Sequence, residues 1–245
     1  MHFKSTLDIV LFVIQLIGCI SFSTSGAIKA IRKKTDILGV WILTLIEIFG
    51  GGLLRDLIIN KEPPHIFWDE EYLLLAGVSL IISTIWFIIG YKKSTAHLIE
   101  KKRHDFWIYL LDALGTSAFV ISGSNLTYSL TPDTFSIFSK CVFIISLGVI
   151  TGIGGGIFRD VFLGDIPTVF KKHFYMTPCI LGATLYTILL INNVNSLFSI
   201  IISMTLMITL RVLATIYKWN LPTCKGYNEL QDNKDNNNNN NNNNK

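Results

Sequence analysis

Long runs of apolar residues, separated by short polar stretches, make up most of the chain up to residue 217. Seven of these runs come close to or exceed the roughly 20 residues that a helix needs to cross a bilayer. The runs are Leu7–Ile28, Ile37–Ile59, Tyr72–Ile89, Phe106–Leu126, Phe135–Leu163, Phe174–Ile191 and Leu197–Tyr217. The pattern predicts an all-α membrane protein with seven transmembrane helices.

One motif occurs twice within these runs. The segment GGGLLRD at 50–56 returns 104 residues later as GGGIFRD at 154–160, and the register holds as far as Pro63 and Pro167. A duplicated unit of three spans is odd in number, so its second copy enters the membrane from the opposite side. The sequence therefore predicts an inverted repeat. We place its parts at 1–104, 105–195 and, for a seventh helix outside the repeat, 196–222, followed by a disordered Asn-rich tail at 223–245.

The first run has a second interpretation, because Lys4, an apolar stretch and small residues at its end also describe a cleavable signal peptide. The internal repeat argues against a leader. Gly18 and Gly26 of this run have counterparts in Gly115 and Gly123 of the fourth. A segment that is removed has no reason to match a retained helix.

The glycine triplets are open to two interpretations. Each glycine weakens a helix by up to about 1 kcal/mol relative to alanine, and freed backbone groups in lipid must be buried or line a water-filled cavity. The triplets could therefore interrupt or kink the second and fifth helices beside an aqueous path, or they could allow close helix packing. The charges that follow favour the first interpretation, with the two triplets facing each other near the midplane.

Ionisable residues at membrane depth are expensive and usually functional. The motif gives these candidates for a pore or substrate pathway: Gly50, Gly51, Gly52, Arg55, Asp56, Gly154, Gly155, Gly156, Arg159 and Asp160. Neighbours in sequence point about 100° apart on a helix, so we expect crossed pairs, Arg55 with Asp160 and Arg159 with Asp56. The alternative is that each pair lies at the interface and extends to water.

Three further charges lie within the runs and are secondary candidates: Glu47, Asp112 and Arg211. Glu47 and Asp112 could attract cations to a pathway, and each of the three could equally serve as a hydrogen-bond partner between helices. Two differences between the copies bear on the candidate site and its surroundings. Gln15 stands where the second copy has Asp112, and Asn60 stands where it has Gly164.

Composition and charge support the membrane assignment and set the orientation. The 245 residues are 50% hydrophobic and only 16% charged, with a mean hydropathy of +0.48. Thirteen Lys and Arg lie on one side of the predicted spans and three on the other, so the C-terminus is predicted to be cytoplasmic and the N-terminus outside or lumenal. The basic stretches 29–34 and 92–103 are topology determinants, with anionic lipid as an alternative partner.

Several functions are disfavoured. A net charge of +4 spread over membrane-flanking loops is unlike a nucleic-acid interface. The four cysteines and five histidines show no metal or redox spacing, no catalytic constellation is present, and no ATP-binding glycine loop is found. We expect neither an enzyme nor a protein with a metal or cofactor.

The paired motifs resemble a known family. Together with Lys29–Val40, Pro64–Leu75, Leu111–Gly123 and Arg211–Pro222, they are similar to bacterial inner-membrane proteins labelled with a glycine transporter domain, which are in turn similar to trimeric intracellular cation channels. The resemblance covers about residues 7–222. It implies a homotrimer in which each protomer has its own pore, bordered by the two glycine-kinked helices, for monovalent cations and chiefly potassium.

Two further functions remain open beside a passive cation channel. A secondary transporter of a small solute such as glycine would use the same broken helices, with the carboxylate at a half-helix N-terminus. The adjacent arginines hold the motif acids ionised, which favours a static channel lining over a proton-coupled carrier. A membrane scaffold without transport would leave the intramembrane charges unexplained.

Overall fold

The computed structural model describes residues 6–60, 63–67, 69–92, 105–132, 134–171, 174–217 and 219, and all regular structure in these segments is helical. The helices are α1 (Thr6–Arg32), α2 (Ile37–Ile58), the short η1 (His65–Phe67), α3 (Glu70–Tyr91), α5 (Asp105–Leu130), α6 (Ile137–Phe162), α7 (Thr168–Lys171), α8 (Met176–Ile191) and α9 (Ser196–Ile216). The tail predicted at 223–245 lies outside the described residues.

The predicted spans are confirmed as helices. Among the described segments, six helices are long and apolar enough to cross a membrane: α1, α2, α3, α5, α6 and α9. The run predicted at Phe174–Ile191 forms α8, which has 16 residues and is shorter than the others. The chain is therefore an all-α, multi-pass membrane protein.

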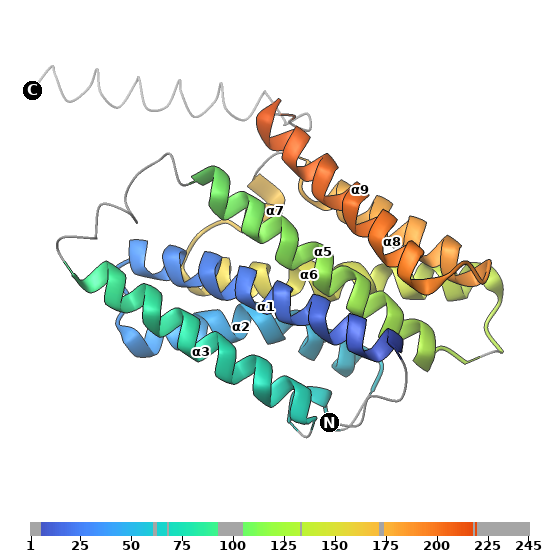
Figure 1. Ribbon diagram of the computed structural model, residues 1–245, viewed down its shortest axis with the longest axis horizontal. Coiled ribbons are helices and arrows are strands. Elements are labelled where there is room, and N and C mark those ends of the chain that lie inside the picture. The colour runs from blue at the N-terminus through green and yellow to red at the C-terminus, as the bar shows by residue number, and fades with distance from the viewer. Residues whose placement is uncertain are drawn as a thin grey trace, which may run out of the picture.

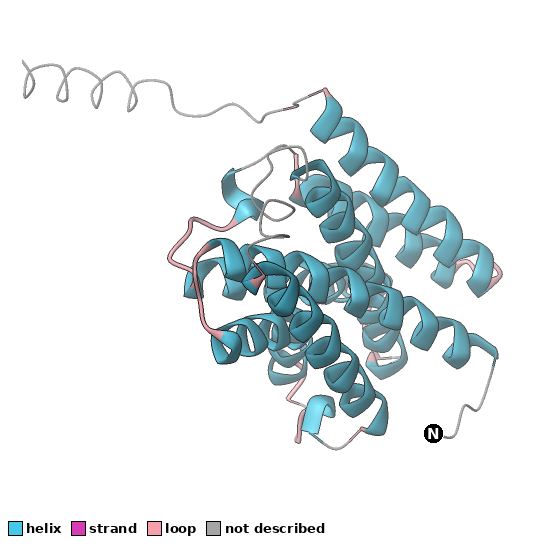
Figure 2. Ribbon diagram, turned by 60° about the vertical axis from the view of Figure 1, so that its left-hand side comes forward, coloured by secondary structure: helices cyan, strands magenta, loops and turns pink. Residues whose placement is uncertain are grey.

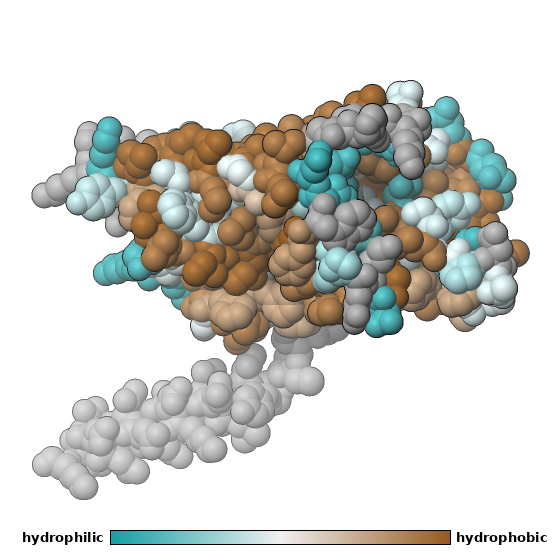
Figure 3. All heavy atoms as spheres, turned by 90° about the horizontal axis from the view of Figure 1, so that it is seen from below, coloured by the Kyte–Doolittle hydropathy of each residue, from teal (hydrophilic) through white to brown (hydrophobic). Residues whose placement is uncertain are grey.

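The surface of α3 shows what solvent this fold meets. Its buried residues are Leu75, Ser79 and Ser83, one turn apart, while Leu73, Ile81 and other large apolar side chains are exposed. A helix in water would show the reverse arrangement. Figure 3 shows hydrophobic residues over much of one face of the molecule, with hydrophilic ones gathered towards its ends.

The helix starts follow from local capping chemistry. The carboxylate of Asp36 accepts a hydrogen bond from the backbone N–H of Gly39 at 2.7 Å and begins α2. Ser136 begins α6 and Asn195 begins α9 in the same way. Each cap satisfies a backbone donor that the helix itself leaves unpaired.

Helices that correspond to each other in the predicted repeat lie in contact, α1 with α5 and α2 with α6. In Figure 1, α1 and α5 run side by side, with α3 beyond α1 and α9 beyond α5, and α2 and α6 lie behind them. Figure 2 shows the same bundle from a second side. Phe22 lies against Gly115 and Gly18 against Ala118, so that α1 and α5 are antiparallel. The antiparallel contact is the one expected of an inverted repeat.

Candidate functional site

The two glycine triplets meet where α2 crosses α6. A Cβ atom on Gly51 would collide with the backbone carbonyl of Thr151, and a Cβ on Gly155 would collide with the carbonyl of Glu47. Because Gly51 corresponds to Gly155 and Glu47 to Thr151, this is one contact made twice. The predicted meeting of the triplets is confirmed, and glycine is required there for close backbone approach.

The prediction that the triplets interrupt their helices is wrong. Helix α2 is helical from Ile37 to Ile58 and α6 from Ile137 to Phe162, straight through both motifs. Tight packing supplies the reason, since the facing helix shields the glycine backbone that would otherwise be exposed. A bend of the helix axes stays a prediction.

The third glycine of each triplet has a different environment. Among the described residues, the nearest atom to a Cβ added at Gly52 would be a guanidinium nitrogen of Arg55, 3.7 Å away. At Gly156 it would be a guanidinium nitrogen of Arg159, 3.9 Å away. These glycines leave room beside an arginine rather than beside a backbone. The triplet thus combines a packing role with an opening next to a buried charge.

The arginines and aspartates pair within each motif, so the predicted crossed pairs are wrong. Arg55 donates to Asp56 through Nε at 2.9 Å and Nη2 at 2.7 Å. Arg159 donates to Asp160 in the same way, at 2.8 and 2.6 Å. The long arginine side chain spans the 100° between neighbours that the prediction treated as too wide. All four residues are buried, which excludes extension to water.

Each aspartate also binds the loop after its helix. The second oxygen of Asp56 accepts from the backbone N–H of His65 at 3.0 Å, and that of Asp160 accepts from the N–H of Thr168 at 2.9 Å. Pro63 and Pro167 hold matching positions in the two copies, two residues before His65 and one residue before Thr168. The prolines are visible in the sequence, but this bond is not. It ties the end of each glycine-bearing helix to the segment that follows it.

The surroundings of the two arginines differ. Nη1 of Arg159 also donates to Glu47 Oε1 and lies 3.8 Å from Asp112 Oδ1. Lys29, which sequence reasoning passed over, lies 3.7 Å from Asp160. Around Arg55 the corresponding positions are held by uncharged Thr151 and Gln15, and Gln15 donates to Ser122 at 2.6 Å. Arg159 therefore lies among additional acids and Arg55 does not.

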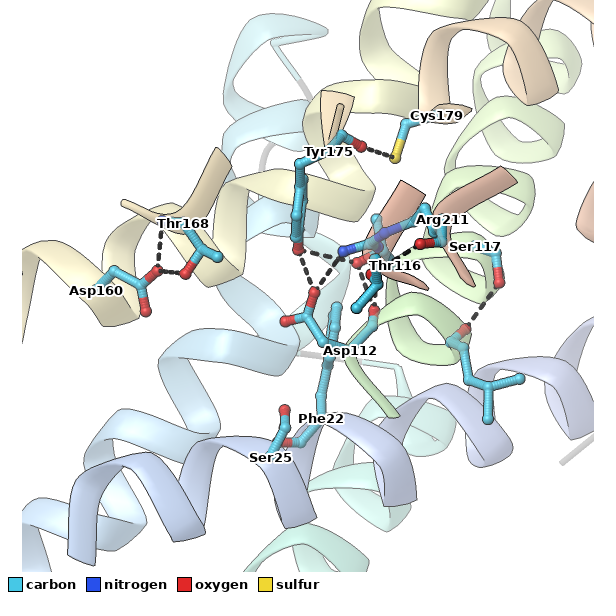
Figure 4. A network of polar contacts seen from close by, with 12 residues as sticks. Phe22, Ser25, Asp112, Thr116, Ser117, Asp160, Thr168, Tyr175, Cys179 and Arg211 are labelled. Carbon is cyan, nitrogen blue, oxygen red and sulfur yellow. Dashed lines mark hydrogen bonds and ion pairs between the residues drawn. The ribbon is translucent and has the colours of Figure 1, made fainter. Parts of the chain in front are cut away.

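A third group connects α9 to this cluster. Arg211 donates to Asp112 Oδ2 at 2.7 Å and stacks 3.7 Å above the ring of Tyr175, whose hydroxyl donates to the same carboxylate oxygen. Figure 4 shows Arg211 and Tyr175 converging on Asp112, with Asp160 and Thr168 to one side. All three secondary candidates thus join the site. Tyr175 was not predicted, because it lies at the polar end of an apolar run.

Two hollows approach the site from opposite ends of the bundle. The larger, of about 550 Å³, has Asp8, Asp69 and Glu71 in its walls and neither Lys nor Arg among its described lining residues. The smaller, of about 300 Å³, is lined by Lys29, Arg32, Lys33, Asp160 and Asp165, among others. We call them the acidic vestibule and the basic vestibule.

A small cavity extends the acidic vestibule inwards. It shares Gln15, Tyr72 and Ser122 with that vestibule and reaches Gly52 and Arg55. Its volume of about 10 Å³ is that of one water molecule. The basic vestibule ends at Asp160, so the ion pairs of Arg159 lie between the two hollows.

Known proteins with similar sequences identify the family to which this architecture belongs. The family model described as "Glycine transporter" matches residues 12–89 and 109–190. A membrane protein of Bacillus subtilis, UPF0126 membrane protein YvgT, is 31% identical over 86% of this chain and 94% of its own length. A UPF0126 membrane protein of Vibrio cholerae is 32% identical over 87% of this chain and 82% of its own length.

Solved structures agree with these matches. A TRIC cation channel, solved to explain conductance, superposes with a TM-score of 0.73 at 29% identity, over 90% of this chain and 98% of its own. A trimeric intracellular cation channel orthologue from Rhodobacter sphaeroides gives 0.72 at 25% identity, over 86% and 99%. The chain belongs to the glycine transporter family of multi-pass membrane proteins, within the TRIC-like fold.

Proposed function

We propose that this protein is a channel for monovalent cations, chiefly potassium, with a pathway inside each protomer. The pathway begins in the acidic vestibule, passes the small cavity at Gly52 and Arg55, crosses the ion pairs of Arg159, and leaves through the basic vestibule at Asp160. The observation that carries the proposal is this alignment of two opposed hollows on the two Arg-Asp motifs. The likeness to TRIC cation channels supports it.

The charges of the pathway fit small cations. The carboxylates at the wide mouth raise the local cation concentration, and the buried acids deeper in have arginine or hydroxyl partners. Buried charges of this kind mark ion paths in membrane proteins. In the conformation described, the path has room for one water beside Arg55 and is crossed by the ion pairs of Arg159, so we take this conformation as a closed state.

Assembly and orientation follow the same proposal. The matched relatives include a protein named as trimeric, and we expect this chain to form a homotrimer with one pathway per protomer. The positive-inside rule places the basic vestibule, with Lys29 and Lys33, on the cytoplasmic side. The acidic vestibule then faces the outside or the lumen. The boundaries at residues 104, 195 and 222 remain predictions of the repeat pattern.

A glycine carrier is the second candidate, favoured by the description of the family model. In such a carrier, Arg55, which borders the small cavity, would bind the carboxylate of the glycine substrate. That cavity has the volume of one water, less than a glycine molecule needs, and the helices beside it are unbroken. A carrier would need a different, wider conformation here.

Purified protein in planar bilayers under a potassium gradient tests the proposal. Unitary current steps with a reversal potential near that of potassium are expected. Parallel liposomes should show no saturable uptake of labelled glycine, with protein-free liposomes as the control for leak. Saturable glycine uptake without current steps would replace the channel by the carrier.

A further inference from the structure

Within the described part of the chain, two buried carboxylate oxygens beside Arg159 have no hydrogen-bond partner. They are Oε2 of Glu47 and Oδ1 of Asp112, and both side chains are at most 3% exposed. A buried, unpaired carboxylate oxygen is costly, and its persistence requires an explanation. The two residues come from different repeats, Glu47 from α2 and Asp112 from α5.

The other oxygen of each carboxylate is firmly held. Glu47 Oε1 accepts from Ser25 at 3.1 Å and from Arg159, and Asp112 Oδ2 accepts from Arg211 at 2.7 Å and from Tyr175. Gly26 makes room for the free end of Glu47, because a Cβ there would overlap Oε2. The surrounding residues thus fix both carboxylates and leave one oxygen of each unused.

Arg159 is bound in a way that allows it to withdraw. Its Nε and Nη2 pair with Asp160, and Nη1 alone reaches Glu47. The guanidinium is one rigid plane, so Nη1 can leave Glu47 only if the whole group shifts. In such a shift Asp160 stays the adjacent counter-charge of Arg159, and Asp112 keeps Arg211. Glu47 would then lose its closest cation, and a potassium ion is comparable in size to the NH2 group that leaves.

We propose that Glu47 and Asp112 form a single binding site for a partly dehydrated monovalent cation, and that Arg159 occupies it as a tethered counter-ion in the closed state. The inference rests on the proposed function, since the site lies between the two hollows of that pathway. The matching positions beside Arg55 do not build a second site. There, Thr151 takes the place of Glu47, seated against Gly123 as Glu47 is against Gly26, and Gln15 takes that of Asp112.

Thermal unfolding of the purified full-length protein tests the site without requiring transport. The midpoint is measured in potassium chloride and in N-methyl-D-glucamine chloride at equal ionic strength. An ion that binds only the folded state raises the midpoint, so potassium should stabilise the wild type. Glu47→Gln should abolish the difference between the salts, and Arg159→Gln should enlarge it, because the competing cation is gone.

A purely structural ion pair predicts something else: both variants lose stability and neither changes the difference between the salts. That result would overturn the inference. Asp36→Asn is the matched control, an acid-to-amide change in the cap of the same helix, a role that asparagine retains, and it should behave as wild type. If Glu47→Gln does not fold, the double variant Glu47→Gln with Arg159→Gln removes both charges together and should also lose the potassium effect.

Currents in bilayers separate this inference from the proposed function. In the double variant, the potassium concentration that half-saturates the unitary current should rise about tenfold or more, as for loss of a charged ligand. Normal currents with unchanged saturation would sink the site and leave the channel standing. A potassium-dependent midpoint that follows the variants, in a protein without current, would support the site and sink the channel.

Discussion

The two Arg-Asp motifs share the same spacing and the same internal geometry but lie in different electrostatic surroundings. Arg55 and Arg159 each hold the next residue with two hydrogen bonds, and each aspartate binds the N–H of the following loop. Around Arg159 stand Glu47 and Asp112. Around Arg55 the equivalent positions carry a hydroxyl and an amide.

The difference shows which part of the repeat is scaffold and which part is specialised. The features common to both halves tie down the helix ends and pack α2 on α6. The features found in one half alone set the charge along the proposed pathway. A water-sized cavity is found beside Arg55, where the additional acids are missing, and the ion pairs occupy the matching place beside Arg159.

Replacing each arginine should reveal the largest difference in stability between the two motifs. Arg159→Met removes the cation that is hydrogen-bonded to buried Glu47, and we expect a loss of about 3–5 kcal/mol of unfolding free energy. Arg55→Met leaves Asp56 still bonded to the backbone of His65, and the expected loss is about 1–3 kcal/mol. Denaturation of both variants in detergent measures the difference between these two losses of unfolding free energy. Equal losses would show that the surrounding acids contribute nothing.

The glycines test the symmetric part. Gly51→Ala and Gly155→Ala each place a methyl group against a backbone carbonyl of the facing helix, and each should lower the unfolding free energy by about 1–3 kcal/mol, as overpacking does. Gly52→Ala and Gly156→Ala, which meet nothing closer than a guanidinium among the described residues, are the matched controls and should change stability little. Thermal midpoints of the four variants give the comparison. A large difference between Gly51→Ala and Gly155→Ala would contradict an equivalent contact.

The third prediction transfers the acid beside Arg159 to the half that lacks it. Thr151→Glu places a carboxylate in the seat beside Gly123, within the cavity that Arg55 borders. We expect this acid to form an ion pair with Arg55 and to lower the unitary potassium current severalfold, because that ion pair would close the water-sized cavity on the proposed path. Thr151→Gln, of the same shape without the charge, is the control. An unchanged current in Thr151→Glu would place the pathway elsewhere.

The sequence sufficed for the fold because the relevant signals are local and repeated. Apolar runs located the helices, and the 104-residue repeat predicted that the two triplets would meet. The sequence did not predict that each arginine pairs with the aspartate next to it, because that pairing depends on the conformation of the arginine side chain. Nor could it predict Tyr175 or Lys29, whose roles arise only when α8 and the end of α1 come close to Asp112 and Asp160.

The unbroken helices illustrate the same limit. The low helix propensity of glycine predicted a break in each helix. In the structure, the backbone of the facing helix packs directly against Gly51 and Gly155 and both helices continue. The propensity is real, but the contact between α2 and α6 outweighs it. A sequence shows the glycine and not the partner that lies against it.

The smallest expected effect concerns the second difference between the copies. Asn60 and Gly164 hold equivalent positions after α2 and α6, and both adopt a left-handed backbone, with φ of 59° and 71°. Asparagine tolerates this conformation better than other residues with side chains. Gly164→Asn should therefore change the unfolding free energy by no more than about 0.5 kcal/mol.

Gly164→Val is the contrasting variant, and it should cost about 1–2 kcal/mol because a branched side chain is strained there. If Gly164→Asn proved as harmful as Gly164→Val, the difference at this position would belong with Glu47 and Thr151, as a specialisation of one half rather than a neutral exchange within the scaffold.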